Sequence, residues 1–141
     1  MNFWFMLALS LLAGSISTMN IWADSIDHTT LHINDVYMVM LMTSWMGLFT
    51  ALYNYKHESY VYLKIGLMLL IIILTLVAIR TQLFVTDRQF LKGMIPHHSM
   101  AITMSKKIRE RTTDQRVRKL ANDIIRSQES EIGIMRRLLS E

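Results

Sequence analysis

The sequence predicts an all-α protein in which three transmembrane helices precede a C-terminal helical hairpin. Hydrophobic residues make up 52% of the 141 residues, which is high for a soluble domain. Three apolar runs, at about 3–21, 36–53 and 61–83, reach the ~17 to 20 residues that a helix needs to cross a bilayer. Beyond them, apolar residues recur at amphipathic helical spacing. We therefore expect a membrane anchor at 1–85 and a separate helical domain at 86–141.

The first apolar run has the position of a cleaved signal peptide but not its flanks. No Lys or Arg precedes the run, and Ile21-Trp22-Ala23 is not the small-x-small pattern of a cleavage site. We favour a retained membrane helix, with a signal peptide as the alternative.

Charge divides the chain near residue 86. The part before it carries three Lys/Arg and four Asp/Glu, whereas the part after it carries twelve and seven. The first loop between spans has three Asp and no Lys or Arg, while the second has Lys56, with Lys64 just beyond. By the positive-inside rule we expect a multi-pass protein of the cell (inner) membrane, with a cytoplasmic N-terminus and an extracytoplasmic or periplasmic C-terminal domain. Arg80 and Arg88, which flank the third span, argue for the opposite orientation.

Two capping patterns and one proline delimit the helices of the hairpin. Thr86-Asp87-Arg88-Gln89 has the S/T-x-x-E/Q form of a capping box and predicts a helix start. Pro96 lacks an N–H and disfavours helical angles at the preceding residue, so the helix either restarts there or is kinked. Thr112-Thr113-Asp114-Gln115 predicts the start of a second helix that runs to about Leu139.

Each helix of the hairpin has a predicted apolar stripe that should form the core. The stripe of the first helix consists of Phe90, Met94, His97, Ala101, Met104 and Ile108. The stripe of the second consists of Val117, Leu120, Ala121, Ile124, Gln128, Ile132, Met135 and Leu139, with Glu131 near its centre. Because burying an amide or carboxylate without a partner is costly, Gln128 and Glu131 should be paired across the hairpin. His97 and His98 are the obvious partners.

These polar residues allow two interpretations. In the first, His97 hydrogen-bonds Gln128 or Glu131 and the pair fixes the register of two helices. In the second, imidazole and thioether groups bind a metal ion, with His97, Met100 and Met104 at i, i+3 and i+7 of one helix. The chain has twelve Met and no Cys, so any soft ligand must be a thioether, and thioethers with imidazole suit Cu(I). A methionine stripe is also common as core filler.

Two segments of the hairpin resemble a known family. FLKGMIPHHSMAITM at 90–104 and SQESEIGIM at 127–135 look like the DUF305 family, which has a Met-Ile-Pro-His-His segment followed by a Gln-x-x-Glu-Ile-x-x-Met segment. The resemblance covers about 87–139 and implies a ferritin-like helical fold and copper binding outside the cytoplasm. The residues that match the family pattern are Met94, His97, His98, Met104, Gln128, Glu131 and Met135. Met100 stands where many relatives have Gly.

The resemblance implies a metal site in which His97, His98, Met94, Met104 and Met135 are the central ligands and Met100 is a further one. Gln128 and Glu131 would then orient the imidazoles. Two helices make only half of a four-helix bundle, and about 55 residues bury little surface on their own. We therefore expect a homodimer or higher homo-oligomer, or else a hairpin that folds back on its own membrane helices.

Further candidate ligands lie in the membrane part. His28 and His32 are four residues apart in the acidic first loop and could form a secondary metal site, although such histidines are more often simply solvated. Met38, Met42 and Met46 form a line on the second span, which packing or lipid contact explains as well as a copper path does.

Several functions are disfavoured. The chain has no phosphate-binding loop, catalytic triad or nucleophile elbow, and Ile134 stands three residues after Glu131, where a di-iron protein would have His. The basic tail has no aromatic platform for nucleic acid, so membrane lipid is the better partner for its charges. We expect a non-catalytic, membrane-anchored copper-binding protein for sequestration, delivery or tolerance. The alternative is a structural or assembly module that oligomerises or docks on a membrane protein complex.

Overall fold

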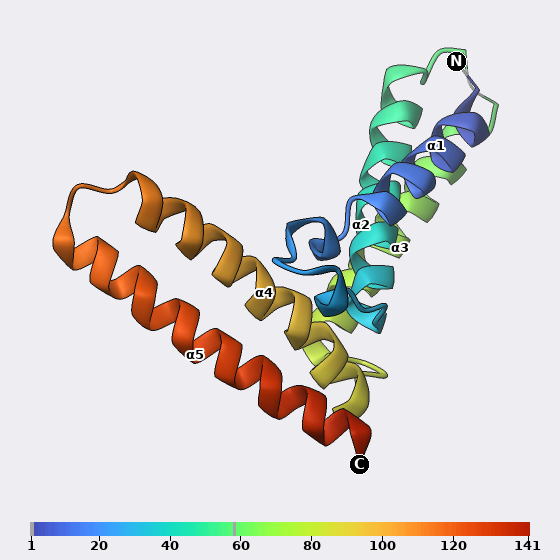
Figure 1. Ribbon diagram of the computed structural model, residues 1–141. Coiled ribbons are helices and arrows are strands. Elements are labelled where there is room, and N and C mark those ends of the chain that lie inside the picture. Colours follow the sequence, from blue (N-terminus) through green and yellow to red (C-terminus); the bar gives the residue numbers. More distant parts are fainter. Residues whose placement is uncertain (1, 58) are drawn as a thin grey trace. The chain divides into compact units, whose positions relative to one another are not determined.

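The computed structural model describes residues 2–57 and 59–141, and over these residues it contains helices and no strands (Figure 1). The chain divides into two compact units. One consists of Met1–Thr18 with Ile33–Phe84, and the other of Met19–His32 with Val85–Glu141. The predicted all-α fold is therefore confirmed.

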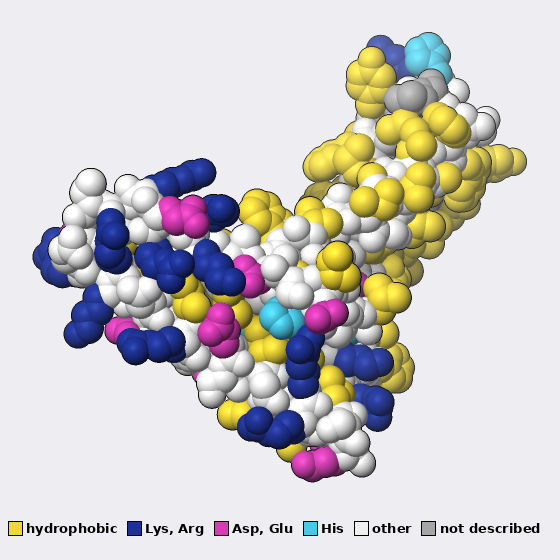
Figure 2. Space-filling view, in the orientation of Figure 1, with side chains coloured by type: hydrophobic (Ala, Val, Ile, Leu, Met, Phe, Trp, Pro, Cys, Tyr) yellow, Lys and Arg dark blue, Asp and Glu magenta, His cyan; other side chains and the backbone are white. Residues whose placement is uncertain are grey.

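The first unit contains the three apolar helices, which are α1 (Phe3–Ile16), α2 (Ile33–Tyr53) and α3 (Val61–Thr81). The candidate spans are 20 or 21 residues long, have mean hydropathy between 1.4 and 2.6, and comprise Phe3–Trp22, Ile33–Tyr53 and Val61–Thr81. Each is long and apolar enough to cross a membrane, as predicted. Hydrophobic side chains dominate the surface of this unit in Figure 2, whereas Lys and Arg are frequent on the other unit.

Helix α2 packs against both α1 and α3. Its Gly47 lies close to both neighbours, since a Cβ added there would lie 2.6 Å from Sδ of Met68 and 2.8 Å from Leu7. Only a glycine fits at this position without displacing the neighbouring side chains, so it sets how closely the helices approach.

The second unit is built on a hairpin of α4 (Asp87–Arg111) and α5 (Gln115–Ser140), which lie side by side (Figure 1). Thr86 caps α4 as predicted, because its side chain accepts the backbone N–H of Gln89. The predicted cap of the second helix was wrong by two residues. Asp114 caps α5 by accepting the N–H of Arg116 at 2.8 Å, while Thr112 ends α4.

The hairpin core uses a different stripe of α4 from the predicted one. Its buried residues are Ile95, Ile102, Ile125, Ile132 and Met135, with Leu91, Met94 and Leu139 packed against them. The predicted stripe is instead mostly open, with Phe90, Met104 and Ile108 52%, 57% and 45% exposed and His97 also exposed. The stripe of α5 was closer to the observed one, since Ala121, Ile132 and Met135 are buried, although Leu120 is exposed.

The reason for this difference is that α4 has more than one face in contact with the rest of its unit. One face packs against α5, and a second contacts the segment Met19–His32. We call these fourteen residues the cover segment. It contains two short 3-10 helices, Met19–Trp22 and Ile26–His28. With two faces occupied, the stripe through Phe90, Met104 and Ile108 is left open.

Pro96 lies inside a continuous α4, so the predicted alternative of a helix restart at this residue was wrong. A proline cannot donate to the carbonyl four residues earlier, which here belongs to Lys92. The hydroxyl of Thr30 in the cover segment donates to that carbonyl instead. The cost of a proline within the helix is thereby partly offset by a contact from a distant part of the chain.

Small side chains of α4 allow the cover segment to approach closely. Ser99 is 0% exposed, and its Oγ accepts the N–H of Asp24 at 2.7 Å and lies 2.8 Å from Nδ1 of His28. A Cβ added to Gly93 would lie 3.3 Å from Nδ1 of His32, so the imidazole packs on the bare helix backbone. Lys106 pairs with the Asp24 carboxylate at 2.6 Å.

We predict that Thr30→Val lowers the free energy of unfolding by about 1 kcal/mol, because the Lys92 carbonyl loses its donor. The cost should be smaller in a Pro96→Ala background, where the alanine N–H supplies a second donor. Denaturant unfolding in detergent, arranged as a double-mutant cycle, measures this coupling.

The matched control is Thr29→Val, which removes a hydroxyl that bonds to Ile26 within the same segment. Its cost should be the same in both backgrounds. Equal costs of Thr30→Val in both backgrounds would show that the Thr30 bond does not compensate for Pro96.

Candidate metal site

A pocket of about 280 Å³ opens between α4 and α5. It is lined by Phe90, Met94, His98, Glu131, Ile134 and Met135. Four of these, namely Met94, His98, Glu131 and Met135, are site residues predicted from the sequence. The hairpin therefore gathers one imidazole, two thioethers and one carboxylate from two helices in one place.

His98 is the more buried of the two ionisable side chains that line this pocket. Its side chain is 14% exposed, and Nδ1 lies 2.8 Å from Oε2 of Glu131, a close polar contact that does not have hydrogen-bond geometry. The other oxygen of Glu131 accepts a hydrogen bond from Ser127 at 2.9 Å. Since Nδ1 faces the carboxylate, Nε2 is the ring nitrogen available to a further partner. A carboxylate on one ring nitrogen and a metal on the other is a recurrent arrangement at histidine metal sites.

Ser127 is a residue that the sequence reasoning missed. It stands one helical turn before Glu131 on α5, so its hydroxyl reaches the carboxylate and holds it toward His98. The i, i+4 spacing of a serine and a glutamate on the polar edge of the stripe was the signal that could have identified it.

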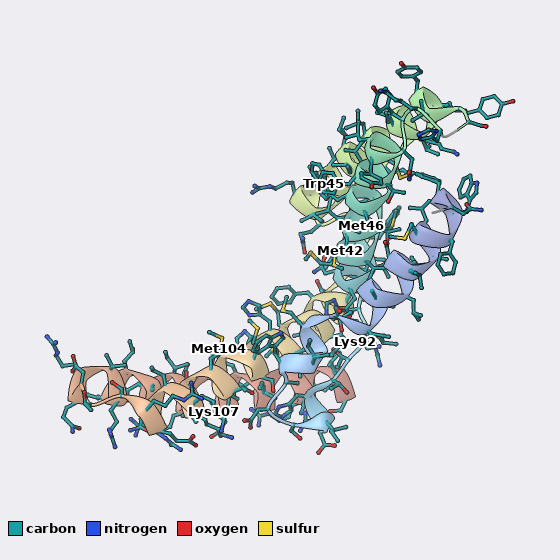
Figure 3. The ribbon with its side chains drawn as sticks, turned by 90° about the horizontal axis from the view of Figure 1, so that it is seen from above. Met42, Trp45, Met46, Lys92, Met104 and Lys107 are labelled. Carbon is teal, nitrogen blue, oxygen red and sulfur yellow. The ribbon has the colours of Figure 1, made fainter. Side chains whose placement is uncertain are left out.

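The other predicted site residues lie outside this pocket. His97 is exposed, with its ring edge-on to that of His98 at a centroid distance of 5.9 Å. Met100 and Gln128 are half-buried. Met104 is 57% exposed and projects from α4 in Figure 3. Of the two histidines predicted as partners across the hairpin, His98 makes the contact with Glu131.

In the described residues, His, Asp and Glu side chains do not form a metal site without the methionine thioethers. Among residues 2–57 and 59–141, no group of three or more His, Asp or Glu side chains is arranged to hold a metal ion. The chain has no Cys. A metal in this pocket would therefore depend on the thioethers of Met94 and Met135 together with His98, which is a soft donor set.

His28 and His32 occupy structural positions in the cover segment. His28 contacts Ser99, and His32, which is 6% exposed, packs on Gly93. Burial lowers the pKa of His28, and the charge of Arg136 on α5 and that of Lys106 on α4 lower it further, against the opposing effect of Asp24 and Asp27.

The methionine line of the second span lies on an open surface of α2. Met38, Met42 and Met46 are 54%, 41% and 40% exposed. Figure 3 shows Met42 and Met46 close to Trp45 on this surface. An exposed apolar surface on a helix of spanning length is what contact with lipid requires.

The fold and the pocket define a class of small helical protein, in which a hairpin carrying a His/Met pocket is joined to three helices of membrane-spanning length. The chain belongs to the DUF305 family, described as a domain of unknown function, whose model matches residues 76–140. It is also similar to the uncharacterized protein L153 of Acanthamoeba polyphaga mimivirus, with 49% identity over 136 residues that cover 96% of this chain and 90% of the relative. No solved structure matches the chain.

The lowered pKa of His28 predicts that acid weakens the second unit. Between the lowered pKa and the ordinary value of 6.5, the unfolded chain binds more protons than the folded one. The stability contributed by neutral His28 is therefore present above the ordinary value and is lost as the pH falls below it. We expect the free energy of unfolding to decrease from about pH 8 to about pH 5, and the decrease to be smaller in His28→Gln.

The matched control is His57→Gln, which replaces an exposed histidine of the other unit. It should keep the pH dependence of the wild type. If His28→Gln and the wild type lose the same stability on acidification, burial of His28 does not affect folding.

Proposed function

We propose that this protein is a membrane-anchored copper-binding protein that holds Cu(I) in the pocket between α4 and α5. The ligands are His98, Met94 and Met135. The observation that carries the proposal is their convergence in one pocket with Glu131 against Nδ1 of His98. Thioether and imidazole donors favour Cu(I) over the harder divalent ions. The role follows as sequestration, delivery or tolerance of copper, and not catalysis.

A second copy of the chain would complete the site. The exposed stripe of α4 carries Phe90, His97, Met104 and Ile108 beside the pocket. Pairing two hairpins through this stripe buries its apolar side chains and makes a four-helix bundle. It also brings His97, Met100 and Met104 of each copy toward the axis, where they can serve as additional ligands.

The proposed location is the cell (inner) membrane, with the N-terminus in the cytoplasm and the hairpin outside it. The three helices of spanning length support a multi-pass arrangement. The loop that carries Lys56 lies at the cytoplasmic end in this orientation. A soft Cu(I) site outside the cytoplasm is consistent with capture of copper before or after it crosses the membrane.

A second candidate function is a non-catalytic assembly module that oligomerises or docks on a membrane protein complex. The contact of His98 with Glu131 favours it, because Ser127, Glu131 and His98 already form a connected polar group across the hairpin without a metal. In this reading the group fixes helix register, as single buried polar residues do in coiled coils.

We predict that the full-length protein in detergent binds Cu(I) more tightly than Zn(II), and that Met94→Leu with Met135→Leu lowers the Cu(I) affinity at least about tenfold. Leucine keeps the packing volume of methionine, so the hairpin should stay folded. Competition against a chromogenic Cu(I) chelator measures the affinity. The control is Met38→Leu with Met42→Leu on the exposed surface of α2, which should bind as the wild type does.

Stability without metal separates the two candidate functions. A register-fixing pair predicts that His98→Ala costs ~1–3 kcal/mol in the metal-free protein, since Glu131 loses its partner. A ligand predicts a small cost without metal and loss of the stabilisation that copper provides. Unchanged Cu(I) affinity in both His98→Ala and the double leucine variant, with the fold intact, would exclude the pocket as a copper site.

We also predict that Met104→Glu with Ile108→Glu converts a dimer into a monomer, because the exposed stripe of α4 then places like charges opposite each other. Sedimentation equilibrium in density-matched detergent measures the mass. Lys107→Glu, at a side chain 63% exposed on the same helix, is the control and should remain dimeric. A wild-type monomer at all concentrations would contradict the proposed pairing.

A further inference from the structure

In the cover segment the large apolar side chains face outward and the polar groups face the helices, which is the reverse of a loop that faces water. Ile21, Trp22, Ile26 and Leu31 are 64%, 56%, 87% and 82% exposed. Loops at a protein surface are ordinarily polar on the side that faces water. Four large apolar side chains directed outward from fourteen residues therefore need a physical explanation.

The polar groups of the segment are directed toward the helices instead. The Asp24 carboxylate pairs with Lys106, and the hydroxyl of Thr30 donates to the backbone of α4. His28 contacts the buried Ser99 of α4. Arg136 of α5 donates to the carbonyl of Asp27 at 2.5 Å. The segment thus uses its hydrogen-bonding groups to hold the hairpin and leaves an apolar outer surface.

The connections at both ends of the segment identify what covers this surface. It follows α1, which ends at Ile16, and leads directly into α2, which begins at Ile33. The first candidate span extends to Trp22 itself. Residue 26 is seven residues from the start of α2, so it is within about 25 Å of that helix end even if the chain between them is fully extended. With α1 and α2 crossing the membrane as in the proposed function, on which this inference rests, both ends of the segment are held at a bilayer surface.

We propose that the cover segment is a membrane-surface anchor, with Ile21, Trp22, Ile26 and Leu31 inserted into the interfacial region of the lipid bilayer. Tryptophan beside aliphatic side chains is the composition that favours this region. Asp27 is the remaining exposed acid of the segment and lies at the level of the headgroups. The hairpin is then held at the membrane through the bonds that α4 and α5 make with the segment.

Lipid fits this surface better than a protein partner. The flanking helices keep the segment beside lipid at all times, whereas a partner would have to be recruited. Of the two acids in the segment, Asp24 is already paired with Lys106, so Asp27 alone is left to pair with a charge at the rim of a protein interface.

Because the chain contains no Cys, single thiols introduced into the full-length protein can be spin-labelled selectively. We would place labels by Ile26→Cys and Leu31→Cys, with Thr113→Cys as a water-exposed reference and Leu74→Cys on α3 as a lipid-exposed one. In phosphatidylcholine vesicles, power saturation of the electron paramagnetic resonance signal measures how often the spin label collides with two reagents. One is oxygen, which concentrates in lipid, and the other is a water-soluble nickel complex. We expect an oxygen-to-nickel ratio at 26 and 31 several-fold above that at 113.

Equal accessibility to the nickel complex at 26, 31 and 113 would overturn the proposal, since the surface would then face water. Protection from both reagents would also overturn it, because a second copy or another protein would then cover the surface. A second experiment needs no label on the segment. In a Trp4→Phe and Trp45→Phe background, brominated lipid should quench the fluorescence of Trp22. Absence of quenching in a folded variant would count equally against insertion.

Discussion

The backbone carbonyl of Lys92 links α4 to the cover segment and so joins the two parts of the second unit. Pro96 removes its usual donor from within α4, and Thr30 replaces that donor from 62 residues away in the chain. A buried carbonyl without a donor is costly, so the helix with Pro96 and the cover segment stabilise each other. Gly93 and Ser99, on the same face, admit His32 and His28 to the helix surface.

The part of α4 that contains the histidine and methionine motif therefore contacts two different neighbours. Gly93, Pro96 and Ser99 face the cover segment and serve packing. Met94 and His98 line the pocket shared with α5. The two sets alternate along one helix because residues three and four apart share a face. A motif that resembles a ligand set is thus partly a docking surface for a loop between two apolar helices.

The sequence was sufficient to predict the helices, because each is marked by a pattern of residues that are close together in the chain. Apolar runs located the three long helices, Thr86 located the start of α4, and helical spacing predicted the hairpin. Three of the candidate ligands, Met94, His98 and Met135, meet in one pocket together with Glu131, as their positions on facing helices suggested. The family was also correctly recognised from the residues around Pro96 and Glu131.

The remaining features depend on contacts that no local pattern contains. Periodicity showed that α4 has apolar stripes but could not show which of them faces α5, so Met104 and Ile108 were placed in the core and are exposed. That His98 contacts Glu131 while His97 is exposed has the same origin, because adjacent residues differ by about 100° around a helix. The docking of His28 and Thr30 on α4 joins positions 62 to 71 residues apart and has no signature in either segment.

The discontinuity of the second unit constrains how the chain threads through a bilayer. Residues 19–32 and 85–141 form one compact body, and 33–84 lie between them in the sequence. In the proposed membrane topology, the intervening stretch leaves one side of the bilayer and returns to it, with α2 as the outward and α3 as the returning crossing. Removing either helix from that topology would place the two parts of this body on opposite sides of the membrane. Residues 19–32 would also meet α4 during synthesis only after both crossings are made. The contacts that Thr30 and His28 make with α4 would therefore require an even number of crossings between residues 32 and 85.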